Sequence, residues 1–138
     1  MQIESADHST PWLRLDERRW LQAAVALAAC VPVSAGLSGV IAGAPTQSPG
    51  FDSHFRYLSG LLLALGLTFW SLIPRIERSG AVVRALTLLV IVGGFARAYA
   101  LVVRGVPGPM GLALIMELGV TPALCLWQMR IARQARLA

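Results

Sequence analysis

Two opposite charges lie inside otherwise apolar stretches of this sequence. Arg97 stands in the stretch 85–103, and Glu117 stands in the stretch 110–129. Each lies about seven residues from the end of its stretch beside the short connector between them. If both stretches are membrane-spanning helices, a rise of ~1.5 Å per residue puts both charges ~10 Å deep. A charge without a partner is costly at that depth, so the sequence predicts that the two side chains pair.

Other polar side chains fall at the same predicted level and complete a candidate cluster. Its members are His54, Arg56, Ser59, Arg97, Tyr99, Arg104 and Glu117. In a structural interpretation, the Arg97–Glu117 pair fixes how two helices pack. In a binding interpretation, the surplus of guanidinium groups holds an anionic group, such as a lipid phosphate or a carboxylate. The sequence leaves both interpretations open.

The candidate cluster lacks the sequence patterns of an enzyme active site or a metal site. Ser59 and His54 fall on different faces of a helix, no Gly-x-Ser-x-Gly surrounds the serine, and no phosphate-binding glycine-rich motif occurs. A metal site needs three or four ligands, and only His54, Asp52 and Glu117 could contribute here. We therefore assign no catalytic residue and expect no metal and no cofactor.

The composition indicates a membrane protein. The chain has 138 residues, of which 56% are hydrophobic and 14% are charged. Soluble domains have about half apolar and about a quarter charged residues. The net charge of +5 comes from arginines that punctuate apolar runs, not from a basic solvated face, so nucleic-acid binding is not expected. Cys30 and Cys125 form no CxxC pair, which argues against a paired-thiol redox enzyme.

Four apolar runs determine the expected fold. They cover residues 21–43, 55–73, 85–103 and 110–129, and each is near the ~20 residues that cross a bilayer. Short connectors rich in Pro, Gly and Arg predict an all-α transmembrane bundle in up-down-up-down order. A single membrane domain over 20–133 would lie between a polar, basic tail over 1–19 and a short basic tail over 134–138. Pro32 and Pro122 are expected to kink their helices.

The arginines predict the orientation. Nine flank the spans on one side: Arg14, Arg18, Arg19, Arg75, Arg78, Arg84, Arg130, Arg133 and Arg136. Only Arg56 and Arg104 flank them on the other side. The positive-inside rule therefore places both termini in the cytoplasm, and Trp20, Trp70 and Trp127 fall at the same predicted interface. A cleaved signal peptide ending near Ala44 is the alternative, but the first run exceeds the usual apolar region of roughly 7–15 residues.

Three segments resemble a bacterial family of small four-span membrane proteins known only as a domain of unknown function. They are His54-Phe55-Arg56-Tyr57-Leu58-Ser59-Gly60, Gly93-Gly94-Phe95-Ala96-Arg97 and Met116-Glu117-Leu118. The likeness covers roughly residues 20–133. It implies a protein of the bacterial cytoplasmic membrane whose polar motifs lie in the candidate cluster, and it implies no reaction or ligand.

The sequence favours a non-enzymatic membrane protein with a structural, accessory or lipid-binding role. Its expected partners are membrane lipids, an anionic lipid headgroup, a partner membrane subunit or a second copy of the chain. Two alternatives stay open. One is a small proton-coupled transporter that uses Glu117, although the arginine bias disfavours exporters that insert in both orientations. The other is an enzyme acting on a lipid or quinone at the interface, with His54 and Glu117 as acid and base.

Overall fold

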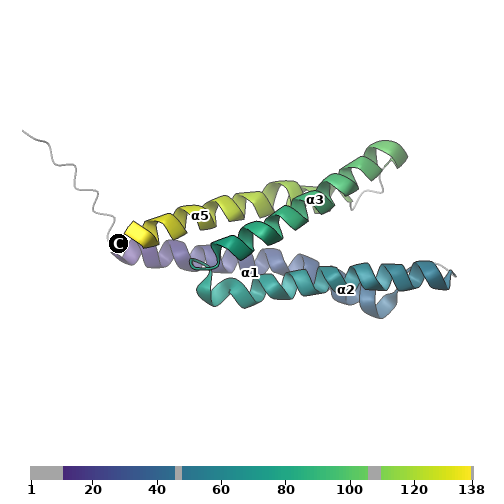
Figure 1. Cartoon of the computed structure of the whole chain (residues 1–138), viewed down its shortest axis with the longest axis horizontal. Coiled ribbons are helices and arrows are strands. Elements are labelled where there is room, and N and C mark those ends of the chain that lie inside the picture. Colours follow the sequence, from purple (N-terminus) through teal and green to yellow (C-terminus); the bar gives the residue numbers. More distant parts are fainter. Residues whose placement is uncertain (1–10, 46–47, 106–109, 138) are drawn as a thin grey trace, which may run out of the picture.

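Long helices dominate the computed structural model of the chain, which describes residues 11–45, 48–105 and 110–137 (Figure 1). In chain order the elements are α1 (Pro11–Ala42), α2 (Pro49–Leu72), a short 3-10 turn η1 (Ile73–Arg75), α3 (Gly80–Arg104), α4 (Met110–Ile115), a π-helical segment η2 (Met116–Val120) and α5 (Thr121–Leu137). The last three follow one another directly and together form the fourth span. The described ranges contain no strand, so the all-α prediction is confirmed.

Four helical segments are long and apolar enough to cross a membrane. They are Asp16–Ala42, Pro49–Arg75, Gly80–Arg104 and Gly111–Ala135. The four apolar runs of the sequence lie almost wholly within these segments, and the short turns between them give antiparallel neighbours. The predicted four-helix transmembrane bundle is therefore confirmed.

The helices extend beyond the apolar runs at both ends of the chain. Helix α1 begins at Pro11 and α5 continues to Leu137, so much of the two expected tails is helical. Contacts to other elements explain part of this extension. Arg18 Nε lies 2.6 Å from Glu77 Oε2, and Trp127 Nε1 donates to Glu17 Oε1 at 3.2 Å. Residues 1–10 of the expected N-terminal tail lie outside the described residues.

The apolar core lies at one end of the bundle. We call this the proximal end: it is where α1 begins, α2 passes into α3 through η1, and α5 ends (Figure 1). The buried apolar cluster draws on α1, α3, α5 and the α2–α3 connector, and consists of Leu21, Val25, Ile76, Val83, Cys125 and Ile131. Phe69 and Leu72 of α2 are partly buried and pack against it. The four spans therefore pack together chiefly at the proximal end.

Side chains from α1 and α5 hold the α2–α3 connector in place at this end. Three side chains of α1 and α5 donate hydrogen bonds to its backbone carbonyl oxygens: Gln22 to Ile73 at 2.8 Å, Arg18 to Pro74 at 3.1 Å and Gln128 to Ile76 at 2.7 Å. Ile73 and Pro74 follow the end of α2, and carbonyls at a helix C-terminus have no partner within the helix, so Gln22 and Arg18 satisfy groups that would otherwise be orphaned. The Ile76 carbonyl accepts from Gln128 in addition to the Ser79 N–H. Gln128 is only 1% exposed, so its hydrogen bond is made away from solvent and lipid.

At the opposite end, which we call the distal end, the bundle separates into two helical hairpins. Figure 1 shows the α1–α2 hairpin and the hairpin of α3 with the fourth span diverging toward this end. In the first hairpin, Gly36 and Gly39 pack directly on α2 at Ser59 and Leu63. In the second, Gly94 packs on η2. Since α2 and α3 make few contacts, each hairpin is held together at the distal end by its own packing.

Candidate functional site

Arg97 and Glu117 form a bidentate ion pair between α3 and η2. Arg97 Nε donates to Glu117 Oε2, and Arg97 Nη2 donates to Glu117 Oε1, both at 3.0 Å. The guanidinium plane matches the carboxylate in this geometry, and such paired charged hydrogen bonds are among the strongest in proteins. The side chains are 35% and 20% exposed, respectively. The pair expected from the sequence is therefore present, and part of it stays uncovered by the rest of the chain.

The π-helical segment that carries Glu117 has a local cause in Pro122. Proline has no backbone N–H, and its ring clashes with the carbonyl four residues earlier in a regular helix. The fourth span meets this restriction with π-type bonding, in which the Thr121 N–H reaches the Met116 carbonyl. The Thr121 hydroxyl donates to the same carbonyl oxygen at 2.8 Å. The expected irregularity at Pro122 thus takes the form of a π turn, whereas α1 continues as one helix through Pro32.

A glycine allows α3 to approach the π turn closely. A Cβ atom on Gly94 would lie 2.7 Å from Leu118 Cδ2 and 3.1 Å from Glu117 Cβ. The neighbouring Gly93 has nothing within 4 Å of the same hypothetical atom. Gly94 is therefore the position that lets Arg97, one turn further along α3, reach the carboxylate.

A second charge pair lies in the first hairpin and caps the end of α1. Arg56 Nε lies 2.8 Å from Asp52 Oδ2, and Asp52 Oδ1 accepts a hydrogen bond from the Ala44 N–H at 2.8 Å. Arg56 Nη1 also donates to the carbonyl oxygens of Val40 and Ile41. These carbonyls belong to the last turn of α1 and have no partner within the helix.

The turn after α1 depends on a glycine in a left-handed conformation. Gly43 has φ of 73°, and its N–H bonds to the Gly39 carbonyl at 3.0 Å. A side chain at Gly43 would be strained by this φ, and its Cβ would collide with Asp52 and Arg56. Gly43 therefore leaves room for the Asp52–Arg56 pair to close over the helix end.

The structure divides the candidate cluster between the two hairpins. Ser59 is buried against Gly39 in the α1–α2 contact, so its role there is packing. His54, Tyr99 and Arg104 are exposed and make no hydrogen bond or ion pair with the described residues. Arg56 therefore does not join the Arg97–Glu117 pair, because the hairpins that carry them diverge at the distal end (Figure 1).

Two polar features of the structure, one in the site and one in the α2–α3 connector, were not predicted from the sequence. The Asp52–Arg56 pair could have been predicted from its spacing, because residues four apart on a helix face one another. Gln22 and Gln128, which hold the α2–α3 connector, are single amides within the apolar runs 21–43 and 110–129. Within the described ranges, no group of three or more His, Cys, Asp or Glu residues is placed to hold a metal ion.

The fold and the polar pairs define a class: an all-α protein of four membrane-spanning helices, with an arginine–carboxylate pair inside one hairpin. The chain belongs to the family described as "Domain of unknown function (DUF4345)", whose model matches residues 20–128. The predicted membership of an uncharacterised family is therefore confirmed. No curated protein and no solved structure matches the chain.

Proposed function

We propose that this chain is a non-enzymatic accessory protein of the bacterial cytoplasmic membrane. In this proposal it binds a transmembrane helix of a partner subunit along the distal part of its second hairpin. Both termini lie in the cytoplasm, because the proximal end carries most of the arginines that flank the spans.

The observation that carries this proposal is the partial exposure of the Arg97–Glu117 pair. Polar groups inside the membrane usually face the interior of a bundle, since exposure to lipid tails is costly. Here the Arg97 side chain is 35% exposed, although both oxygens of the Glu117 carboxylate are engaged. A partner helix seated over the pair would remove it from lipid without leaving a charge unmatched.

The surroundings of the pair suit a helical partner. Gly93 and Ala100 lie four residues before and three residues after Arg97, which places them close to its face of α3, and both are exposed. Small residues let helix backbones approach closely, which is a main source of association in lipid.

The two alternative functions find less support. A proton-coupled transporter must exchange a proton between Glu117 and water, but both oxygens of that carboxylate are bound by Arg97. An enzyme that used His54 with Glu117 would need both in one site, and they belong to hairpins that diverge at the distal end.

Site-specific photo-crosslinking in native membranes tests the proposal. A photoreactive residue at Ala100 should give a discrete adduct with a second polypeptide. The same residue at Leu27, which is 72% exposed on the proximal part of α1, should give lipid adducts only. Lipid adducts alone at both positions would refute the proposal. A proton-driven flux in vesicles that is lost in Glu117→Gln would favour the transporter.

A further inference from the structure

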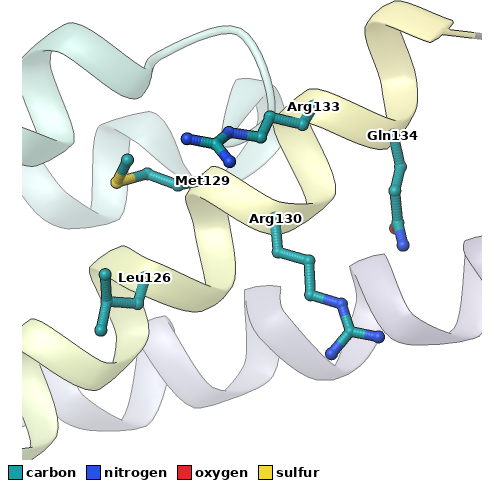
Figure 2. A pocket seen from close by; sticks show the side chains of 5 residues that line it. All are labelled: Leu126, Met129, Arg130, Arg133 and Gln134. Atoms are coloured by element: carbon teal, nitrogen blue, oxygen red, sulfur yellow. The ribbon is translucent and has the colours of Figure 1, made fainter.

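A shallow hollow lies on α5 at the proximal end, remote from the Arg97–Glu117 pair. It has a volume of about 290 Å³ and is lined by Leu126, Met129, Arg130, Arg133 and Gln134 (Figure 2). This volume is near the lower bound of ~300 Å³ for small-molecule sites, so the hollow suits a small polar group more than a whole lipid.

The two arginines of this hollow have no counter-charge in the described part of the chain. Arg130 and Arg133 are exposed, and neither makes a hydrogen bond or an ion pair there. Arg18, Arg56 and Arg97, in contrast, each pair with a carboxylate. Arg130 and Arg133 are three residues apart on α5, so they lie on one stripe of the helix, and both line the hollow. In Figure 2 the Arg130 guanidinium extends toward α1, and the Arg133 guanidinium extends to the other side of α5. The hollow thus has two unpaired positive charges at its border.

The lining changes from apolar to charged along α5. Leu126 and Met129 lie toward the middle of the span, and Arg130, Arg133 and Gln134 lie toward its end. Trp127 stands near this change, and tryptophan prefers the interface between the hydrocarbon and the headgroups. A phospholipid has the same order, with acyl chains first and the phosphate beyond them.

Carboxylates on the neighbouring helix do not fill the hollow. Glu17 of α1 approaches α5, but it accepts a hydrogen bond from Trp127 and is not among the lining residues. The only polar side chains in the lining are the two guanidiniums and the Gln134 amide, which can all donate hydrogen bonds.

From this geometry we infer that the hollow binds the headgroup of an anionic phospholipid in the leaflet that surrounds the proximal end. Arg130 and Arg133 hold the phosphodiester, Gln134 donates to the headgroup, and an acyl chain lies along Leu126 and Met129. Basic residues clustered at the end of a transmembrane helix attract the anionic lipids of the surrounding leaflet. The inference needs only that α5 crosses a membrane, so it stands or falls separately from the partner-helix proposal.

Native mass spectrometry of the full chain in mild detergent tests this inference, with phosphatidylglycerol and phosphatidylcholine as the two lipid probes. Phosphatidylglycerol should bind more tightly than phosphatidylcholine. The double variant Arg130→Gln/Arg133→Gln should weaken phosphatidylglycerol binding about 30-fold, as expected for two arginines near a headgroup. Both side chains are exposed and unpaired in the described fold, so the variant should keep its helical circular dichroism.

The matched control is the double variant Arg75→Gln/Arg78→Gln. These arginines have the same spacing, lie at the same end and are exposed, but they do not line the hollow. The control should bind phosphatidylglycerol like the unaltered chain, and soluble glycerol phosphate should not displace the lipid. Equal losses in the two variants, equal binding of the two lipids or displacement by glycerol phosphate would overturn the inference.

Discussion

Arg97 on α3 and Glu117 on η2 engage each other with two hydrogen bonds of 3.0 Å, across 20 residues of sequence. The pair joins the two helices of the second hairpin at a level where the first hairpin is no longer packed against them. Close approach at Gly94 and the π turn before Pro122 create the space and the direction for this contact. Substitutions of Gly94 and Pro122 should therefore alter this contact without changing either charged residue.

Replacing Gly94 by alanine should destabilise the second hairpin, because its new Cβ would lie 2.7 Å from Leu118 Cδ2. Overpacking of this kind costs roughly 1–3 kcal/mol. Gly93→Ala is the matched control: it meets nothing within 4 Å and should be neutral or stabilising by up to ~1 kcal/mol through helix propensity. Unfolding by SDS in mixed micelles measures both variants. Equal effects on the free energy of unfolding would show that α3 does not approach η2 at Gly94.

In the first hairpin, Gly36→Ala should weaken the packing of α1 on α2 more severely. The added Cβ would lie 2.5 Å from the Leu63 nitrogen and 2.7 Å from the Ser59 carbonyl oxygen, and backbone atoms cannot move aside as a side chain can. We expect a loss of about 2 kcal/mol or more in the free energy of unfolding. Gly60→Ala, which meets open space on α2, should cause no loss. A Gly36→Ala variant as stable as Gly60→Ala would contradict this packing.

Removal of the Arg56 side chain should fray the end of α1. Arg56→Met deprives the Val40 and Ile41 carbonyls of their donor and leaves Asp52 without its cation. Because Arg56 is partly exposed, we expect a loss of about 1–2 kcal/mol. Hydrogen exchange should also become faster in the last turn of α1. Arg104→Met removes an exposed arginine that has no partner in the described residues, and it should leave exchange in α1 unchanged.

Pro122→Ala should convert the π turn to regular α-helix. Residue 122 would gain an N–H that can donate to the Leu118 carbonyl, which proline cannot do. A π turn holds one residue more than an α turn. Rewinding it as α-helix therefore rotates the preceding side chains by about 100° relative to the rest of the helix. Glu117 would then turn away from Arg97, and substitution of Arg97 should destabilise the Pro122→Ala background less than the unaltered chain. An unchanged effect of Arg97→Ala in that background would contradict this account of the π turn.

The membrane architecture and the central pair could be predicted from the sequence for simple physical reasons. Hydrocarbon thickness sets the length of a span, and the position of Arg97 and Glu117 along their runs gives their depth directly. Depth says nothing, however, about direction around the helix axis or about which helices are in contact. For this reason the sequence grouped Arg56 with Arg97, whereas the structure places them on separate hairpins, where Asp52 pairs with Arg56.

The core and the connector were harder to predict because every span is apolar on most of its surface. Uniform hydrophobicity does not distinguish a face toward the bundle from one toward lipid, so the concentration of buried residues at the proximal end left no clear pattern. Gln128 is the one buried residue here whose type gave a signal, because a lone amide in an apolar run needs a hydrogen-bond partner. The structure supplies that partner in the Ile76 carbonyl.

A double-mutant cycle on Arg97 and Glu117 tests the central structural claim most directly. Free energies of unfolding would be measured for Arg97→Ala, Glu117→Ala and the double variant. Each single change leaves one charge unpaired within the membrane and should cost roughly 1–3 kcal/mol. The double variant should lose less than the sum of the two single losses, with a coupling energy of about 1 kcal/mol or more. Strictly additive losses would mean that the two side chains do not interact, and would contradict the account.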